Sequence, residues 1–274
     1  MDLTSVEGLI IDMDGVLWRG LEPLPDLPRF FDVLRQAGIR YVLATNNPSR
    51  RPEEFVEKAL GFGVRWTPAE VISSATVTLE YLRRHYQQGE RVHVIGEPSL
   101  HDMIAEAGFV LTDDGAKVVV AAMDRRMTYE TLKRGTLLLR AGADFIATNP
   151  DASYPSEEGI VPGSGTMMAA LMASSGRTPE VMGKPAAHLF ELALGRLGLP
   201  RARVASLGDR LDTDVAGARA FGLRSILVLT GFTRREDLST SGIQPDAVCR
   251  DIGELADLLE AAPRPPAAES GPAS

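Results

Sequence analysis

The sequence predicts an α/β protein built around a largely parallel sheet. Short β-branched runs alternate with longer amphipathic stretches along most of the 274 residues, and several of the runs end in polar residues. A hydrophobic content of 44% is ordinary for a globular chain and is enough to bury a sizeable core. The order of the elements further indicates one α/β domain inserted into another.

The domain that receives the insertion has a strand that ends at Asp12 and a second that ends at Thr45. Its later strands end at Asp209 and Thr230. A helix with the acidic first-turn residues Glu53 and Glu54 follows the second strand. The expected strands of this set are residues 9–11, 40–44, 203–207 and 225–229, and a further expected helix is residues 28–37.

A second set of elements lies between these. Its expected strands are residues 91–95, 117–122 and 144–147, and its expected helices are residues 99–107, 129–140 and 166–174. We interpret residues 79–180 as an inserted α/β domain, and residues 1–78 with 181–261 as the domain into which it is inserted. Residues 262–274 are rich in Pro, Ala and Ser without periodicity, so we expect a disordered tail.

Composition narrows the class of partner. The formal net charge of −8 argues against nucleic acid, whose phosphates require clustered Lys and Arg, but permits a small anionic substrate. Cys249 is the only cysteine, so no disulfide can form within the chain, which is typical of a reducing cytosol. No apolar run is long enough for a signal peptide or a membrane span. We therefore expect a cytoplasmic protein with no membrane partner.

The first chemical motif is Asp12-Met13-Asp14-Gly15. Ligands of open α/β sheets bind outside the carboxyl ends of the strands, which is where these residues lie. Two carboxylates at one strand end repel each other unless a cation compensates their charge. Taken alone, the motif fits an ordinary surface turn equally well.

Two further segments suit an anion. Thr45, Asn46 and Asn47 end the second strand with a hydroxyl, two amides and main-chain N–H groups, a neutral cradle for phosphate. Lys184 stands between Gly183 and Pro185 and offers a compact cation. Each segment alone is more commonly a loop or helix cap, and Lys184 does not belong to a P-loop.

Residues 208–214 place Asp209, Asp212 and Asp214 after another strand. Magnesium prefers oxygen ligands, commonly one or two carboxylates with waters. A capped helix with acidic first-turn residues is the alternative, but it does not explain so many acids at one strand end. Together the four segments supply a nucleophile, an acid/base, an anion cradle, a cation and metal ligands, which no single structural explanation covers.

The ordered motifs D-x-D-G, T-N-N, K-P and G-D-x-x-x-x-D resemble those of haloacid dehalogenase (HAD) superfamily phosphatases. The chain is most similar to their subfamily IIA, the NagD-like group, which includes p-nitrophenylphosphatases, phosphoglycolate phosphatases and pyridoxal phosphate phosphatases. The resemblance runs from about residue 8 to residue 259. Its closest matches are residues 45–47 with Arg50, 147–151, 162–163, 182–185, 208–214 and 229–231.

This resemblance implies a Rossmann-like core with a C2-type cap between the second and third motifs. It makes Asp12 the nucleophile and Asp14 the general acid/base. The implied phosphate-binding residues are Thr45, Asn46, Asn47 and Lys184, and the implied Mg²⁺ ligands are Asp12, the main-chain carbonyl of Asp14, Asp209 and, in support, Asp214. Tyr154 falls near the cap loop that selects substrate in the pyridoxal phosphate enzymes.

We therefore predict a Mg²⁺-dependent phosphatase that hydrolyses small monoesters through an aspartyl-phosphate. Expected substrates are phosphoglycolate, glycerol phosphate, pyridoxal phosphate, p-nitrophenyl phosphate or similar metabolites, and a homodimer through the cap is expected. A phosphomutase or phosphotransferase with the same intermediate, or a non-catalytic phospholigand-binding protein, is the alternative. Trp18 is expected to serve packing, and Cys249 to end a strand without a nucleophilic role.

Overall fold

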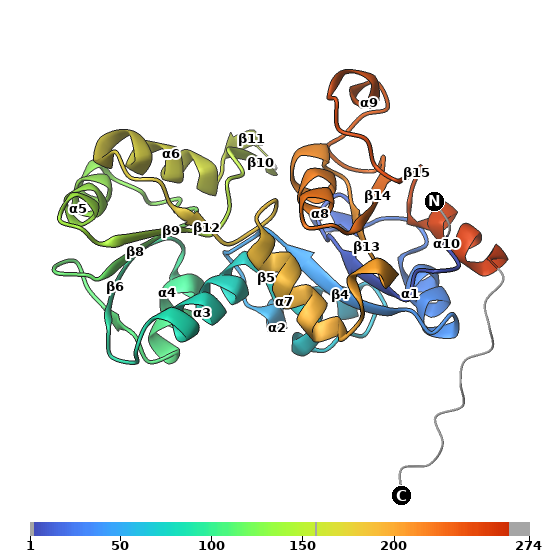
Figure 1. Cartoon of the computed structure of the whole chain (residues 1–274), viewed down its shortest axis with the longest axis horizontal. Coiled ribbons are helices and arrows are strands. Elements are labelled where there is room, and N and C mark those ends of the chain that lie inside the picture. The colour runs from blue at the N-terminus through green and yellow to red at the C-terminus, as the bar shows by residue number, and fades with distance from the viewer. Residues whose placement is uncertain (1–2, 157, 263–274) are drawn as a thin grey trace, which may run out of the picture. The chain divides into compact units, whose positions relative to one another are not determined.

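The computed structural model describes residues 3–156 and 158–262, so nearly all of the tail expected to be disordered lies outside the described residues. The chain divides into two compact units (Figure 1). The first is formed by the described residues of Met1–Leu43, Lys58–Trp66 and Ala193–Ser274, and the second by Ala44–Glu57 and Thr67–Leu192. These are units of internal packing, and the boundaries of the core and cap domains stay a prediction.

The first unit is built on parallel strands in the order β15-β14-β13-β1-β4. Their bounds are β15 (Ala247–Cys249), β14 (Arg224–Val228), β13 (Val204–Gly208), β1 (Gly8–Ile11) and β4 (Arg40–Thr45), whose last two residues enter the second unit. All four residues of β1 are buried, because strands lie on both of its sides. Ile11 pairs with Leu207 of β13, so both strands end at one edge of the sheet.

Helices and an aromatic cluster complete this unit. The helix α1 (Leu27–Gln36) starts with Pro28 in its first turn and buries an apolar face against α10 (Ile252–Ala261). The rings of Trp18, Phe31, Phe62 and Trp66 contact one another. The remaining elements are β2 (Trp18–Arg19), β3 (Glu22–Pro23), a turn of 3-10 helix at Arg201–Arg203, α8 (Ala216–Ala220) and α9 (Asp237–Thr240).

The second unit has its own parallel sheet, in the order β12-β9-β8-β6-β7. The strands are β12 (Glu180–Val181), β9 (Asp144–Ala147), β8 (Val118–Ala121), β6 (Arg91–Ile95) and β7 (Val110–Leu111). The helices α5 (Tyr129–Arg140) and α6 (Ser164–Ser175) pack side by side on one face, and α3 (Ser74–His85) and α4 (Pro98–Glu106) lie on the other (Figure 1). The other elements are a 3-10 turn at Pro68–Glu70, β5 (Val71–Ser73) and the hairpin of β10 (Ser153–Ser156) and β11 (Gly159–Pro162).

Two helices cross the division between the units, α2 (Pro52–Gly61) and α7 (Ala187–Leu197). The predicted α/β class with largely parallel sheets is confirmed, and the expected strands and helices agree with the observed ones to within about two residues. The hairpin was missed because its two prolines weaken the strand pattern, and its turn depends on the positive φ of Gly159. Among the described residues, none of the helices has the length and apolar character that a membrane crossing requires.

Candidate active site

The first unit brings together the carboxylates of Asp12, Asp209 and Asp214. One oxygen of each lies within 4.8 Å of the other two. The side chains are nearly inaccessible, with exposed fractions of 8%, 4% and 2%. Three buried carboxylates at this spacing repel one another strongly unless a cation lies between them. The all-oxygen donor set is the one that Mg²⁺ or another hard cation prefers, so the group fits a metal.

Adjacent strands position these carboxylates. Asp12 follows β1, and its main-chain N–H donates to the carbonyl of Leu207 at 2.8 Å, which extends the ladder by one residue. Asp209 follows Gly208, the last residue of β13. Asp214 lies in a short π-helical turn, Leu211–Val215, that leads into α8. Such turns are rare and frequently occur at functional sites.

Three glycines make room for the acids. A Cβ atom at Gly231 would lie 1.8 Å from Asp209 Oδ2, and one at Gly15 would lie 2.5 Å from the same oxygen. A Cβ atom at Gly208 would lie 2.1 Å from Asp214 Cγ. Gly15 also has a φ of 86°, which favours glycine for its backbone alone. Any side chain at these three positions would therefore displace a carboxylate.

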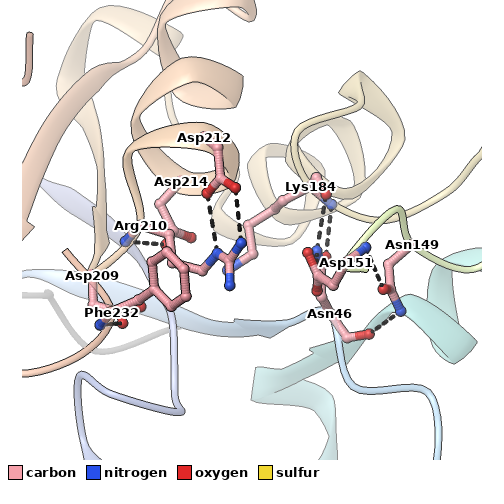
Figure 2. A network of polar contacts seen from close by, with 9 residues as sticks. All are labelled: Asn46, Asn149, Asp151, Lys184, Asp209, Arg210, Asp212, Asp214 and Phe232. Atoms are coloured by element: carbon pink, nitrogen blue, oxygen red, sulfur yellow. Dashed lines mark hydrogen bonds and ion pairs between the residues drawn. The ribbon is translucent and has the colours of Figure 1, made fainter. Parts of the chain in front are cut away.

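Main-chain donors orient the two later acids (Figure 2). The N–H of Phe232 donates to Asp209 Oδ2 at 2.5 Å, and the N–H of Arg210 donates to Asp214 Oδ2 at 3.1 Å. The third acid of this segment, Asp212, instead forms a two-pronged ion pair with Arg210, at 3.1 and 2.8 Å. Asp212 is therefore not part of the group of three, and the guanidinium that it binds stacks 4.2 Å from the ring centre of Phe232.

Asp14 is exposed, and it is oriented by a residue that sequence reasoning assigned only to packing. The indole N–H of Trp18 donates to Asp14 Oδ1 at 2.8 Å. The indole itself is fully buried, with the rings of Phe62 and Trp66 against it and the Lys58 ammonium 4.0 Å from its ring centre, so the packing assignment is confirmed. A buried indole needs a hydrogen-bond acceptor, and the four-residue spacing was the available signal for this pair.

The second unit holds a polar network centred on Asn46 (Figure 2). The Asn46 amide nitrogen donates to Asp151 Oδ2 at 3.1 Å and to the carbonyl of Lys184 at 2.9 Å, and its amide oxygen accepts from the Lys184 N–H at 2.7 Å. The Asn46 carbonyl accepts from Asn149 at 2.7 Å. The amide nitrogen and the amide oxygen of Asn46 are thus both hydrogen-bonded to other residues of the protein. The sequence matches at 147–151 named Asn149 and Asp151 without giving them this role.

Lys184 and Thr45 are buried beside this network, with exposed fractions of 3% each. The ammonium of Lys184 donates to the carbonyl of Ala44 at 3.0 Å, and the Thr45 hydroxyl accepts from the N–H of Asn47 at 3.1 Å. The side chain of Asn47 accepts from both the N–H and the hydroxyl of Ser49. A buried ammonium is costly unless it is hydrogen-bonded or paired with an anion, so Lys184 suits anion binding.

Tyr154 lies on the hairpin, at the β10 position that pairs with Val161. Its hydroxyl accepts from the Arg125 guanidinium at 3.3 Å, and Arg125 also lies 3.6 Å from Glu97. The hydrogen bond to Tyr154 raises the pKa of Arg125 above its usual value. Cys249 ends β15 as expected, and burial raises the pKa of its thiol to about 11, so the thiol stays protonated at neutral pH.

The sequence is similar to protein families and proteins of known function. A family described as haloacid dehalogenase-like hydrolase matches residues 9–110, and one described as HAD-hydrolase-like matches residues 181–255. The acid sugar phosphatase of Staphylococcus aureus is 35% identical over 259 residues, 94% of this chain and 100% of that protein. The chain belongs to the haloacid dehalogenase superfamily.

Solved structures of phosphatases are similar to this chain in both fold and sequence. The 4-nitrophenylphosphatase of Thermotoga maritima is similar with a TM-score of 0.89 and 37% identity, over 95% of this chain and 99% of that one. The glycerol phosphate phosphatase of Mycobacterium tuberculosis, in complex with magnesium, gives 0.84 and 32%, over 94% of this chain and 80% of that one. This superfamily member is therefore a phosphatase of the NagD-like and p-nitrophenylphosphatase group, as its motifs predicted.

Proposed function

We propose that this HAD phosphatase hydrolyses small phosphate monoesters with Mg²⁺ as its cofactor and Asp12 as its nucleophile. The observation that carries the proposal is a group of three buried carboxylates: Asp12 and Asp209 follow adjacent parallel strands, and Asp214 lies in the turn after the second of them. Mg²⁺ held by Asp12, Asp209, Asp214 and the Asp14 carbonyl would offset negative charge on the phosphoryl oxygens. The magnesium complex of the glycerol phosphate phosphatase supports this choice of metal.

The chain's own residues supply the steps. An Asp12 oxygen forms a bond to phosphorus while the ester P–O bond breaks, and Asp14 gives its proton to the departing alkoxide oxygen. Asp14 then removes a proton from a water molecule, whose oxygen attacks the aspartyl-phosphate. The bond between phosphorus and Asp12 breaks, inorganic phosphate leaves, and the Asp12 carboxylate is restored. The Trp18 N–H holds Asp14 in place through both steps.

We propose, from the motif order, that Lys184 and the segment 45–47 bind the transferring phosphate. Lys184 suits this role because it is a buried cation. Since the Asn46 side chain is fully engaged by Asp151 and Lys184, its part is to position the Lys184 backbone. Phosphate contacts of the segment would then come from the Thr45 hydroxyl and from main-chain and Asn47 donors.

The substrate class follows from chemistry and relatives. The names of the similar proteins are acid sugar, 4-nitrophenyl and glycerol phosphate phosphatase, which all describe compact monoesters. We propose that phosphoglycolate, glycerol phosphate, pyridoxal phosphate and p-nitrophenyl phosphate are candidates, with Tyr154 contributing to selection. A cytoplasmic location and a homodimer through the cap are further proposals, and light scattering in solution measures the oligomeric state.

The decisive experiment compares the wild-type protein with Asp12→Asn on a panel of these monoesters with added Mg²⁺. Wild type should release one inorganic phosphate per ester cleaved, and Asp12→Asn should lose at least about 10³-fold in kcat, because a neutral amide is a poor nucleophile. Transfer of phosphate to a second hydroxyl without free phosphate would establish a mutase or transferase instead. Near-normal turnover by a folded Asp12→Asn protein contradicts the mechanism.

A further inference from the structure

The parallel sheet of the second unit reverses its winding direction between β6 and β8. The chain passes from β6 outward to β7, and then from β8 outward in the opposite direction to β9 and β12. In open α/β sheets, ligands bind outside the carboxyl ends of the strands at such a switch point. The inserted unit therefore has a topological binding position of its own, separate from the carboxylates that follow β1 and β13.

A cavity of about 460 Å³ is located at this switch point. It is lined by Gly96, which follows β6, and by Asp124, which comes shortly after β8. Thr131 and Arg134 of α5 also line it, so the cavity reaches the N-terminal half of that helix, a position that favours anions. Cavities of this size hold small metabolites.

His93, from the middle of β6, lines the cavity and is only 4% exposed. Its Nδ1 lies 2.9 Å from the carbonyl of Thr112 and 3.4 Å from a carboxylate oxygen of Asp113. Both neighbours only accept, so Nδ1 is the donor nitrogen of the ring, and in that tautomer Nε2 is the acceptor. Nε2 is buried and has no hydrogen-bond partner among the residues that the structure describes. A buried acceptor of this kind needs a donor.

Both acidic and basic side chains line the cavity. Three acids line it, but each already has a partner: Asp113 lies beside His93, Asp124 accepts from the main-chain N–H of Arg126, and Glu130 pairs with Lys133. The guanidinium groups of Arg126 and Arg134, by contrast, form no hydrogen bond or ion pair with another described residue, although Arg134 adds to Lys133 in lowering the pKa of Glu130. Two exposed arginines and the histidine that carries the unpartnered nitrogen thus line one cavity.

We propose that this cavity binds a small oxyanion that also carries a hydroxyl group. The oxyanion would be held by Arg126 and Arg134, since guanidinium groups recognise phosphate and carboxylate in two-pronged geometry. The hydroxyl would donate to His93 Nε2. Monoprotonated inorganic phosphate and small hydroxy acids both have this chemistry. None of the lining residues belongs to the proposed active site, and the existence of the cavity site does not rest on the proposed reaction.

The test uses the full-length protein in chelated, metal-free solution, with ¹⁵N-resolved NMR of its four histidine rings. Titration with inorganic phosphate should shift the His93 Nε2 resonance saturably. Sulfate has the same shape but no proton at neutral pH, so it should bind at least about tenfold more weakly, as expected when a buried acceptor is left unpaired. Glycolate compared with acetate repeats the contrast for carboxylates, and the tighter of phosphate and glycolate identifies the preferred anion.

Two exposed arginines on α5 give matched variants. Arg134→Gln should weaken the phosphate response at His93 at least about tenfold, whereas Arg140→Gln, on the same helix outside the cavity lining, should leave it unchanged. Both should keep wild-type hydrolysis of p-nitrophenyl phosphate, which separates this site from the active site. The absence of a saturable His93 shift, equal binding of sulfate, or equal effects of the two substitutions would overturn the proposal.

Discussion

Among the glycines beside the three carboxylates, Gly231 leaves the least room for a side chain, because an added methyl group would meet Asp209. In Gly231→Ala the new Cβ would lie 1.8 Å from Asp209 Oδ2, whereas real Cβ atoms essentially never come within 3.0 Å of another heavy atom. The two atoms must therefore separate by roughly 1.2 Å. Gly231 does not have a positive φ, so the backbone itself accepts alanine.

This displacement should weaken metal binding more than folding. It moves an oxygen of the proposed metal site and disturbs the charge-assisted hydrogen bond from the Phe232 N–H. Changes in the groups that orient metal ligands typically reduce affinity about 10–100-fold. At a Mg²⁺ concentration 100 times the wild-type Kd, stabilisation by the metal would fall from about 2.7 kcal/mol to between about 1.4 and 0.4 kcal/mol. Calorimetric titration with Mg²⁺ alone and thermal unfolding with and without Mg²⁺ measure both quantities.

Two controls isolate the cause. Gly195→Ala, inside α7, places its Cβ at least 4 Å from every neighbouring heavy atom, so Mg²⁺ affinity should not change, and the unfolding free energy should rise by up to about 1 kcal/mol. Phe232→Ala keeps the N–H that binds Asp209 and should retain the affinity, while Phe232→Pro removes the N–H and should lose it. Wild-type Mg²⁺ affinity in folded Gly231→Ala would refute the reasoning.

Three further predictions follow from the site. A chelator should abolish activity and Mg²⁺ should restore it, whereas Ca²⁺ should inhibit because its longer, looser coordination misplaces Asp12; full activity after exhaustive chelation would exclude the metal. Trp18→Phe removes the hydrogen bond to Asp14 and should lower kcat about tenfold for glycerol phosphate but less for p-nitrophenyl phosphate, whose leaving group needs little protonation; equal losses would contradict Asp14 as the acid. Tyr154→Ala should reorder kcat/KM across the monoester panel while p-nitrophenyl phosphate turnover stays within about threefold; an unchanged order would move the search for a selector to Arg125.

The strands and helices could be predicted from the sequence because each depends on a local pattern of residues. Residues 9–11 are an apolar run that ends in a charged residue, and residues 129–140 follow a threonine cap with helical periodicity, so each range can be read without knowledge of its neighbours. The hairpin that carries Tyr154 has no such signal. Its two strands stabilise each other through pairing, and its prolines weaken the alternation on which sequence prediction depends.

The candidate residues show the same division. The motif order singled out Asp12, Asp14, Lys184 and Asp209 as candidates for the chemistry, because residue types and their order along the chain are properties of the sequence. It also grouped Asp212 with Asp214 as acids of one segment. Only the π-helical turn at Leu211–Val215 separates them, since it turns Asp214 toward Asp209 and leaves Asp212 to pair with Arg210.

The sequence by itself thus determined the superfamily, the parallel α/β architecture and the carboxylates that are proposed to react. The tertiary structure alone decided which groups position these side chains. The Trp18 indole binds Asp14, and the Phe232 N–H and the missing side chain of Gly231 fix Asp209. The Asn46 amide is likewise bound to Lys184 and Asp151. Most of these partners are far from each other in the chain. A hydrogen bond or a close approach between distant residues depends on how the strands pair and the loops turn, and no local pattern of residues encodes that distance.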